Sequence, residues 1–556
     1  MKSLTNPGWI IPTLTTVAAA WPACQAFGQP ADAVIPEDRL RWHIPDPEVD
    51  RGIAEARLEK ALAENDKATI AQIERILRRV DQIRKPVRIH LTLQDALQRA
   101  LANNYAIQVE SFNPAVETTR VVEAEAAFDA VFFSNLIKNK IDRPTGSELA
   151  ANDLDFVESQ TGIRKLLPSG MLVSAAYRFQ RTDTSLAFQQ INPEYFNDLV
   201  LEMRQPLLRG FGLDYNRSLI RIAKNDRRIS NFAFARQVRD TLRNVEELYW
   251  RLVFARRDVV ITARLLSEFE RIYDYLDARQ QFDITPVQLA ATKANLEQSR
   301  ARFIQTLSNL YDAEDQLINA LNDPQIDLAR DLEILPDDFP SMERLEVDPL
   351  AEAQAALDHR QEIREQEIRV ESAKILVGRA KNELLPQLDF TFRYTIDGLD
   401  TNLDAAFDQL TMHRFVEYFI GVEFEMPIGN RGPRAAHRRF ELQHKQAVAQ
   451  LQAVLEQVIL DVNTAVRRLY TRYDQIAPSY ESAVAREKEV DSIVARAERR
   501  DFVVLNQELG ALQSLAEARR AMLVAIVDYN IAIIDLEQAK GTLLLYNNVV
   551  IPTDED

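Results

Sequence analysis

The sequence predicts a mainly α fold with a β portion that is either a membrane β-barrel portion or a half-buried sheet, built as two tandem repeats of a helix, a set of strands and a long helical hairpin. Glycine and proline punctuate helices, yet residues 213–322 contain no glycine and one proline, Pro286. Residues 433–509 again contain no glycine. Short segments that alternate between apolar and polar residues precede both regions. Long helices that twice follow membrane-type strands indicate a duplicated unit.

The spacing of apolar residues supports the long hairpins. From residue 242 to 273, apolar side chains recur every three or four positions, with Arg256 and Glu270 as polar interruptions. The same spacing returns from Leu512 to Leu536. This rhythm is typical of a coiled-coil seam. A helix from Leu213 to Asp277 would be about 97 Å long.

The composition excludes several classes of function. The chain has 556 residues and a formal net charge of −17, and no large basic cluster offsets this charge, so we expect no nucleic-acid partner. No apolar run is long enough for a transmembrane helix. None of the six histidines forms a His-Glu-x-x-His pair, and no nucleophile elbow or nucleotide loop is present. We therefore expect no catalytic residues, no metal and no cofactor.

The N-terminus has the features of an export signal over residues 1–28, with a short apolar stretch from Trp9 to Ala20 followed by small residues. Ordinary cleavage, lipidation of the single cysteine Cys24, and no processing stay open. Residues 29–90 form an N-terminal extension with an amphipathic helix from Asp50 to Ile83. This helix either packs on the main body or acts as a tether.

The two repeats open on similar helices. Residues 91–335 form repeat 1, whose first helix has Thr92 as its candidate N-cap. Residues 336–548 form repeat 2, which opens at Asp348-Pro349. Residues 549–556 are a C-terminal tail. One long period means two copies of a unit and not a solenoid.

The strands carry the membrane signal. In repeat 2, residues 388–396 place Leu, Phe, Tyr and Ile on one face and Asp, Thr and Arg on the other, and residues 417–426 alternate similarly. Repeat 1 has strand segments at residues 171–180 and 199–204, and weaker candidates at 128–137 and 155–164. A strand of about ten residues crosses a bilayer when tilted. A half-buried sheet on a soluble core has the same period, so both interpretations stay open.

Together these features resemble the TolC family of outer-membrane efflux proteins over residues 91–548. The resemblance is carried by the Leu-Thr-Leu-x-x-Ala-Leu opening at Leu91, the strand-to-helix turns at Gln205-Pro206 and Met426-Pro427, and the hairpin ends at 509–519, Tyr529-Asn530 and 539–543. It implies a homotrimer with one shared β-barrel in the outer membrane and a trimeric α-barrel through the periplasm. Residues 154–181 depart from the family pattern as an added hairpin, so the number of strands per subunit stays open.

The resemblance also implies a function. It indicates a passive outer-membrane duct of a tripartite efflux or type I secretion system, in the outer membrane of a Gram-negative-type cell and extending into the periplasm. The cargo would be small molecules or proteins. The implied partners are a periplasmic adaptor protein, an inner-membrane pump that supplies the energy, and outer-membrane lipid. The alternative is a structural coiled-coil protein of the envelope with a soluble β-domain.

The hairpin turns supply one set of candidate site residues. By resemblance, they form the periplasmic end that meets the adaptor, through Phe282, Ile284, Thr285, Pro286, Phe502 and Val503. Pro286 suits the first turn of a returning helix, with Thr285 as its N-cap. Ordinary turns, in which the two phenylalanines close the coiled coil, are the alternative.

Charged residues at the same tips supply a second set. The resemblance implies an end that is closed at rest, and the candidate gate residues are Asp283, Arg499, Arg500 and Asp501. Arg–carboxylate pairs between neighbouring hairpins could hold the closed state. Solvated tip charges, worth about 0–1 kcal/mol each, are the alternative. If these residues do not form the gate, Glu508 or the acids from Glu487 to Asp491 are the next candidates.

Overall fold

A computed structural model describes residues 87–144, 146, 151–186, 188–282, 284–326, 332–495 and 502–551. All of them belong to one compact unit, Glu74–Asp556. The predicted signal segment, Cys24 and the amphipathic helix from Asp50 to Ile83 lie outside the described residues.

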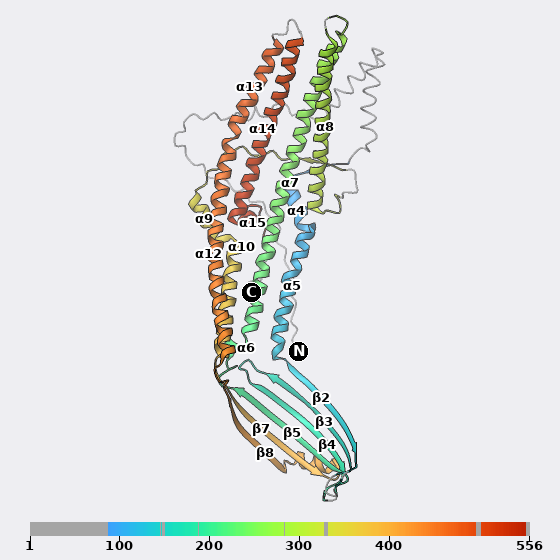
Figure 1. Cartoon of the computed structure of the whole chain (residues 1–556), viewed down its shortest axis with the longest axis vertical. Helices are drawn as coiled ribbons and strands as arrows, with labels where there is room; N and C mark the ends of the chain where they lie inside the picture. Colours follow the sequence, from blue (N-terminus) through green and yellow to red (C-terminus); the bar gives the residue numbers. More distant parts are fainter. Residues whose placement is uncertain are drawn as a thin grey trace, which may run out of the picture. The chain divides into compact units, whose positions relative to one another are not determined.

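The elements follow the predicted order of helices, strands and long hairpin in both halves (Figure 1). The first half runs through β1 (Val87–Leu91), α4 (Leu93–Asn103), α5 (Tyr105–Glu125), the 3-10 turn η1 (Ala126–Phe128), β2 (Ala130–Asp142), β3 (Asp153–Leu166), β4 (Leu172–Thr184), β5 (Glu194–Pro206), α6 (Leu213–Asn216), α7 (Ser218–Ala278), α8 (Pro286–Leu321) and β6 (Leu332–Pro336). The second half runs through α9 (Pro349–His359), α10 (Gln361–Glu383), β7 (Gln387–Asp400), α11 (Leu403–Thr411), β8 (Phe415–Glu425), α12 (Arg431–Asp474), α13 (Ile476–Ala495), α14 (Phe502–Lys540) and α15 (Leu543–Tyr546).

The long helices form because their apolar stripes are buried against one another. α7 spans 61 residues and buries Leu242, Val245, Tyr249 and Leu252 in one core with α4, α8 and α14. No helix among the residues described here combines the length and apolar character needed to cross a membrane. Below the hairpins, α5 packs on α7, α7 on α10, and α10 on α12, which gives a row of four helices. α5 and α12 are the ends of this row.

Within the described residues, six strands form one antiparallel sheet in the order β2-β3-β4-β5-β7-β8. The strands predicted in repeat 2 are β7 and β8, the clearer pair in repeat 1 are β4 and β5, and the weaker candidates are β2 and β3. The added hairpin predicted at residues 154–181 is therefore formed by β3 and β4. Four strands come from the first half and two from the second.

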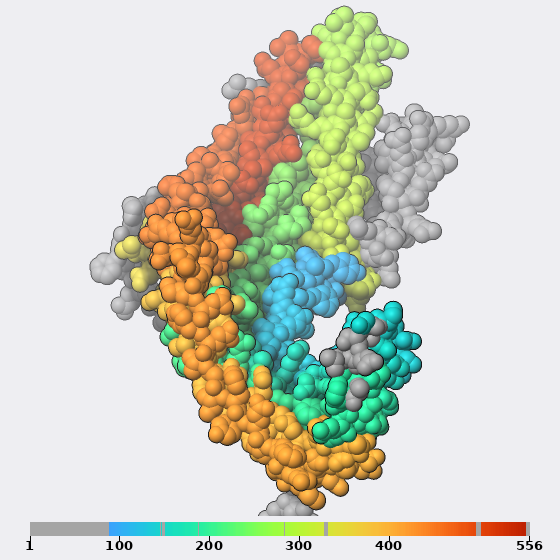
Figure 2. All heavy atoms as spheres, turned by 60° about the horizontal axis from the view of Figure 1, so that its bottom comes forward, coloured from blue at the N-terminus to red at the C-terminus, as the bar shows by residue number. Residues whose placement is uncertain are grey.

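The register of the sheet separates an apolar face from a charged face. Phe392 on β7 lies opposite Met203 on β5 and Ile420 on β8. The next residue, Arg393, lies opposite Glu202 and donates from Nε to its Oε2 at 2.8 Å. Because side chains alternate along a strand, β5, β7 and β8 are apolar on one side of the sheet and ion-paired on the other. On β3, Lys165 lies on the same side as Phe392, in register through Val173 and Met203. Figure 2 shows the sheet from its free end, with the N-terminal strands in cyan and teal and the C-terminal strands in orange.

A two-stranded parallel sheet joins the start of the first half to its end, which the sequence analysis did not predict. β1 pairs with β6 from Val87 opposite Leu332 to Leu91 opposite Pro336. The Arg256 guanidinium donates to the Ile334 carbonyl at 2.9 Å and to Glu333. A polar interruption of the α7 seam is thus the residue that holds this small sheet.

Tyrosine side chains hold the segment between the two halves against the helices. The Tyr249 hydroxyl lies 3.0 Å from the Leu91 carbonyl oxygen and 2.7 Å from Asp338 Oδ2. The Tyr470 hydroxyl binds both the backbone N–H and the carbonyl of Val347. Leu91 and Val347 each lie two residues before the first helix of their half. Tyr249 and Tyr470 therefore occupy matching positions in the duplicated plan.

Tyr529 and Asn530 complete this attachment. The Tyr529 hydroxyl donates to the Glu343 carbonyl at 2.6 Å and accepts from the Leu345 N–H at 3.1 Å. The Asn530 amide binds the N–H and carbonyl of Ser341. The Tyr-Asn pair thus satisfies four backbone groups of a segment that has no regular secondary structure of its own.

Glu246 on α7 is a buried acid at the junction with the C-terminal segment. It is 1% exposed, and its Oε1 accepts from Asn547 Nδ2 at 2.5 Å. Burial raises the pKa of Glu246 to about 7, and Glu537 adds to this, although the hydrogen bond from Asn547 opposes it. The folded protein therefore binds a proton here that the unfolded chain has already lost between about pH 4.5 and pH 7.

We predict that Tyr529→Phe destabilises the fold by about 1 kcal/mol, because two partly buried hydrogen bonds to the backbone of Glu343 and Leu345 are lost. Thermal unfolding followed by circular dichroism measures the change. Tyr418→Phe is the matched control, since Tyr418 is exposed on β8, and it should leave the midpoint unchanged. Equal midpoints for wild type and Tyr529→Phe would show that the attachment is not a stabilising feature.

We predict that Glu246→Gln becomes stabilising as the pH rises. The raised pKa means that the stability supplied by protonated Glu246 is complete below about pH 4.5 and is lost through about pH 7, which amounts to about 3 kcal/mol. The glutamine variant should therefore unfold at a higher temperature than wild type at about pH 8 and at a similar temperature near pH 5. Glu123→Gln, at an exposed position on α5, should show no such pH-dependent difference.

Candidate functional site: the hairpin tips and the seam between the hairpins

The first hairpin turn has the local geometry predicted for it. Thr285 is the N-cap of α8, and its hydroxyl accepts from the Gln288 N–H, while the Gln288 side chain accepts from the Thr285 N–H. Pro286 is the first residue of the helix, where its missing N–H costs no hydrogen bond. The two predicted roles, N-cap and first-turn proline, are confirmed.

The tip residues divide into buried and exposed sets. Ile284 is 7% exposed and packs with residues of α7, α8 and α14, so it stabilises the tip from within and does not present a surface to a partner. Phe282 is 84% exposed and Val503 is 62% exposed. Phe502 is half-buried. The apolar surface of the tips therefore includes Phe282 and Val503, together with Val287, which the sequence analysis did not select.

The four candidate gate residues, Asp283, Arg499, Arg500 and Asp501, lie outside the described residues. Of the next candidates, Glu508 is placed clearly. It is 0% exposed on α14, and its Oε1 accepts from Arg271 Nη2 on α7 at 2.9 Å. Arg271 also donates from Nε to Glu268 Oε2 at 2.7 Å. Glu508 therefore joins the second hairpin to the first.

Two further ion pairs cross the same seam between α7 and α14. Arg520 binds Asp258 at 3.0 Å, and Arg243 binds Asp535 at 2.8 Å. The two residue numbers of each pair add to almost the same value, as expected for neighbouring helices that run antiparallel. Apolar side chains such as Leu265 and Leu512 lie between the pairs. The seam is thus a line of apolar contacts with an Arg–carboxylate pair at intervals.

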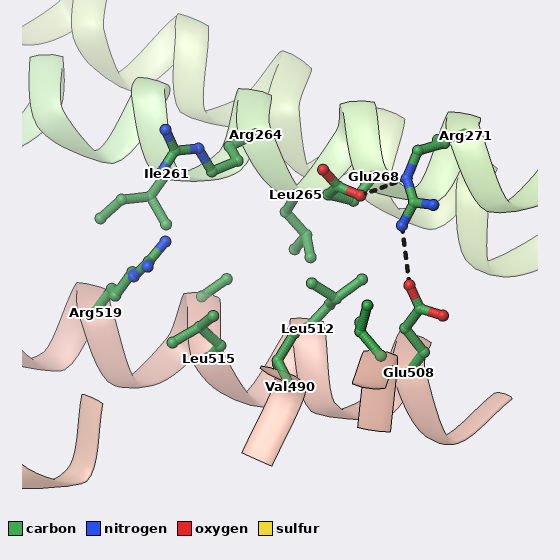
Figure 3. A pocket seen from close by; sticks show the side chains of 12 residues that line it. Ile261, Arg264, Leu265, Glu268, Arg271, Val490, Glu508, Leu512, Leu515 and Arg519 are labelled. Atoms are coloured by element: carbon green, nitrogen blue, oxygen red, sulfur yellow. Dashed lines mark hydrogen bonds and ion pairs between the residues drawn. The ribbon is translucent and has the colours of Figure 1, made fainter. Parts of the chain in front are cut away.

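An open cavity of about 270 Å³ lies at the tip end of this seam (Figure 3). It is lined by α7, α13 and α14, with Leu265 and Leu512 near its centre and the Arg271–Glu508 pair at one side. On α14, Arg519 binds Glu487 of α13 at 2.8 Å. The packing between the hairpins is therefore looser here than within them.

The buried acids at the seam each have one carboxylate oxygen without a hydrogen-bond donor. Glu508 Oε2 and Asp258 Oδ1 are buried and have no hydrogen-bond partner within the described chain. Burial raises the pKa of Asp258, although Arg520 opposes this. Burial also lowers the pKa of Arg271, but Glu268 and Glu508 outweigh it, so that this pKa is raised overall. A buried carboxylate oxygen without a donor weakens an ion pair, so the seam is held less firmly than its ion pairs suggest.

The described residues offer no other chemistry at this site. No group of three or more His, Cys, Asp or Glu side chains in this part of the chain could hold a metal ion. The sequence analysis selected Glu508 but missed Arg271, Asp258 and Arg520. Their polar positions within apolar seams of α7 and α14 were the available signal, since a charged residue on a buried stripe needs a partner.

The fold is that of known outer-membrane channels. The chain is similar to the Campylobacter jejuni CmeC outer membrane channel, at 16% identity and a TM-score of 0.59, over 81% of this chain and 86% of that one. It is similar to the open state of the Neisseria gonorrhoeae MtrE outer membrane channel, at 17% identity and a TM-score of 0.59, over 81% and 89%. The Vibrio cholerae outer membrane protein VceC matches at 15% identity and a TM-score of 0.58, over 81% and 96%.

A family model matches most of the second half of the chain. Residues 353–542 match the model described as outer membrane efflux protein, and no curated protein matches the chain. This region holds the strand-to-helix turn at Met426-Pro427 and the Tyr529-Asn530 pair, on which the predicted resemblance depended. The resemblance is confirmed: the chain carries an outer membrane efflux protein domain within the fold of TolC-like outer-membrane channels.

Proposed function

We propose that three copies of this chain form a passive duct that exports molecules through the outer membrane and the periplasm. The observation that carries the proposal is the sheet. Over β5, β7 and β8 one face is suited to lipid and the other to water, and both edges of the sheet are unpaired among the described residues. The family match and the fold support an outer-membrane efflux channel.

The two faces of the sheet define the inside and the outside of the barrel. On one face of β7 and β8, each apolar side chain lies directly opposite another apolar side chain, from Leu388 opposite Phe424 to Ile396 opposite Val416. On β8 these side chains are largely exposed. The opposite face carries Arg393 bound to Glu202 and Arg204 bound to Asp389 at 2.7 Å. A charged face cannot contact acyl chains, so it lines the lumen.

The edges of the sheet require further copies. An unpaired strand edge leaves backbone N–H and C=O groups without partners, which lipid cannot supply. The sheet has an even number of described strands, so β2 and β8 run in opposite directions. β8 of one copy can therefore pair with β2 of the next in the antiparallel sense that holds throughout the sheet. Three copies of six strands give eighteen, a number at which barrels enclose an aqueous channel.

The helices end at matching edges. α5 leads into β2, and β8 leads into α12, so the ends of the helix row continue the edges of the sheet. α5 exposes Tyr105, Val109, Phe112 and Val116, which recur every three or four residues and form one unpartnered apolar stripe. Packing this stripe against α12 of a neighbouring copy would close a tunnel of twelve helices. Sheet and helices thus point to the same ring of three copies.

The hairpin tips are the part of the duct that would meet the adaptor. Phe282, Val287 and Val503 are exposed apolar residues at the end of the hairpins, while Thr285 and Pro286 fix the turn beside them. An inner-membrane pump would supply the energy, since the duct holds no site of energy conversion among its described residues. The cargo is either small molecules or proteins.

We further propose that the tip end opens by separation of the two hairpins along the α7–α14 seam. The Arg271–Glu508 pair lies seven residues from the end of α7, about 10 Å along the helix. One carboxylate oxygen of Glu508 has no hydrogen-bond donor, and an open cavity lies in the seam beside it. These features support a weak latch that a partner could release at small cost. Asp283, Arg499, Arg500 and Asp501 stay candidates for contacts at the tip itself.

A structural envelope protein with a soluble β-domain is the other candidate. Such a domain would cover the apolar face of its sheet. Here the apolar side chains of β8, including Tyr418, Ile420 and Val422, are more than half exposed. A continuous exposed apolar patch of this kind favours lipid as the surrounding medium.

We predict that Phe392→Arg prevents assembly in the membrane. Phe392 is at the centre of the apolar face of β7, where arginine costs about 2–4 kcal/mol. Size-exclusion chromatography of the detergent-extracted protein, with and without heating, should show loss of the trimer. Arg393→Ala is the matched control on the other face, because its pair with Glu202 is partly exposed and worth about 0–1 kcal/mol. The proposed duct would be ruled out if the wild-type protein were soluble without detergent as a monomer. It would also be ruled out if the Phe392→Arg variant still assembled as a trimer.

We predict that Arg271→Ala gives a larger or more frequently open pore. The change leaves Glu508 buried without its cation, which weakens the seam between the hairpins. Single-channel conductance of the reconstituted protein measures the effect. Arg300→Ala is the control, since Arg300 pairs with Glu270 and Glu297 within the first hairpin. If both variants conduct like wild type while trimer content is unchanged, the opening is not controlled by this seam.

A further inference from the structure

The helix between β7 and β8 lies flat on the apolar face of the sheet. An ideal Cβ at Gly398 of β7 would lie 2.0 Å from the Ala406 carbonyl oxygen of α11, so only glycine permits this contact. Gly398 is an even number of residues from Phe392 and Ile396 along β7, so it lies on the same face of the sheet as they do. Ala406 and Leu410 are buried against the strands, as is Ile396 beneath them.

The contacts of α11 fix its rotation on the sheet. The Gln409 side chain accepts from the Leu399 N–H at 3.2 Å and donates to Asp400 Oδ2 at 3.1 Å, at the outer end of β7. The Phe407 ring meets the Tyr177 ring edge-on, with centroids 6.3 Å apart. Tyr177 is in register with Leu199, which is in register with Ile396. Phe407 therefore lies over β4 at the register of Ile396, which is two residues closer to the apolar band than Gly398.

The position of α11 along β7 places it at a boundary. Phe392 is at the centre of the apolar residues that run from Leu388 to Ile396, and Gly398 is six residues further out. Six residues span about 20 Å along a strand, or about 15 Å along the membrane normal for a strand tilted near 40°. The hydrocarbon core extends about 15 Å from the midplane. α11 therefore lies where acyl chains give way to headgroups.

The free surface of α11 suits that boundary. Leu403 and Phe407, one turn apart, are close to half exposed. Asp404 and Asp408 occupy the next positions round the helix and are exposed. Aromatic side chains of the same sheet face surround the contact, namely Tyr177, and Phe179 with Tyr195 at a centroid distance of 6.3 Å. Aromatic residues gather at the two rims of membrane barrels because their rings are partly apolar and partly polar.

We infer that α11 is an interfacial helix that binds the outer leaflet of the membrane on the outside of the barrel. Leu403 and Phe407 contact the acyl chains, and Asp404 and Asp408 remain among hydrated headgroups. This inference rests on the proposed barrel, because it takes the apolar face as the lipid face. It assigns a lipid-binding surface to a connection that would otherwise be a loop above the membrane.

Lipid is the occupant that the geometry favours over a second copy of the chain. α11 contacts β5 and β7, and Phe407 contacts β4 through Tyr177, all of them inside the sheet. The edges at which copies meet are β2 and β8. The surface of α11 is also continuous with the exposed apolar band of β7 and β8, which is surrounded by lipid in the proposed barrel.

Site-directed spin labelling of the reconstituted full-length protein tests the inference. The single native cysteine, Cys24, is replaced by serine, and one cysteine is introduced by Phe407→Cys, Asp408→Cys or Ile420→Cys. Ile420 is the lipid reference, because it is exposed on β8 opposite Phe392. Collision rates with oxygen, which concentrates in acyl chains, and with a water-soluble nickel complex report the depth of each label. Leu403→Cys serves as a second position on the Phe407 flank.

We expect labels at Phe407 and Ile420 to collide mainly with oxygen, with the Phe407 label about 10–15 Å nearer the outer surface. The Asp408 label should collide mainly with nickel. A lipid-exposed Ile420 label with water-exposed labels at Phe407 and Leu403 would overturn the inference and leave the barrel intact. Dipolar broadening of the Phe407 label in the trimer would also overturn it, by making a second copy the occupant. A water-exposed Ile420 label would reject the barrel, and the inference with it.

Discussion

Every backbone hydrogen-bonding group that lies in lipid must have a partner within the protein, and this constraint governs the whole architecture. The sheet of a single chain cannot meet it, because β2 and β8 each leave one edge unpaired. An even number of strands makes these two edges antiparallel, so copies of the chain can satisfy each other. The helix row that continues the same edges leaves an apolar stripe on α5 exposed. In the proposed trimer, closing the ring would give both edges of the sheet and the α5 stripe their partners.

The hairpins meet a different requirement, since a duct must hold its tips together and still allow them to part. Away from the tips, α7, α8 and α14 share one apolar core that crosses from the first hairpin to the second. Between the hairpins, the α7–α14 seam alternates apolar contacts with Arg–carboxylate pairs, and buried oxygens of Asp258 and Glu508 lack a donor. Removing such an oxygen from water costs free energy that a single ion pair does not fully return. The open cavity at the tip end of the seam thus lies between the two parts that would move in the proposed opening.

The sequence was sufficient for features that depend on local pattern. The alternation in β7 and β8, the absence of glycine from α7, and the Thr285-Pro286 helix start each follow from neighbouring residues. The parallel pairing of β1 with β6 joins segments that are far apart in the chain, so local pattern does not predict it. The spacing of apolar residues on α7 likewise does not show that Arg256 binds this small sheet. Ile284 was selected as surface because it adjoins a turn, but its burial depends on α14, which packs there from the other repeat. α11 was not predicted because nine residues between two strands are too few to show a clear helical period. Its position on the sheet also depends on Gly398, which has no side chain to block the close approach of the helix.

The number of strands also fits the width of the helix row. Neighbouring helices pack about 9 Å apart, so four helices of one copy occupy about 36 Å of the ring. Strands about 4.8 Å apart and tilted near 40° each occupy about 6 Å of circumference. Four strands would span only about 25 Å, whereas the six described strands span about 37 Å. In the proposed trimer, the added hairpin of β3 and β4 would therefore give the barrel nearly the same circumference as the tunnel that it continues. A ring of three such copies needs no narrowing at the junction, so its barrel should not restrict the size of cargo, and the control of passage falls to the hairpin tips at the other end.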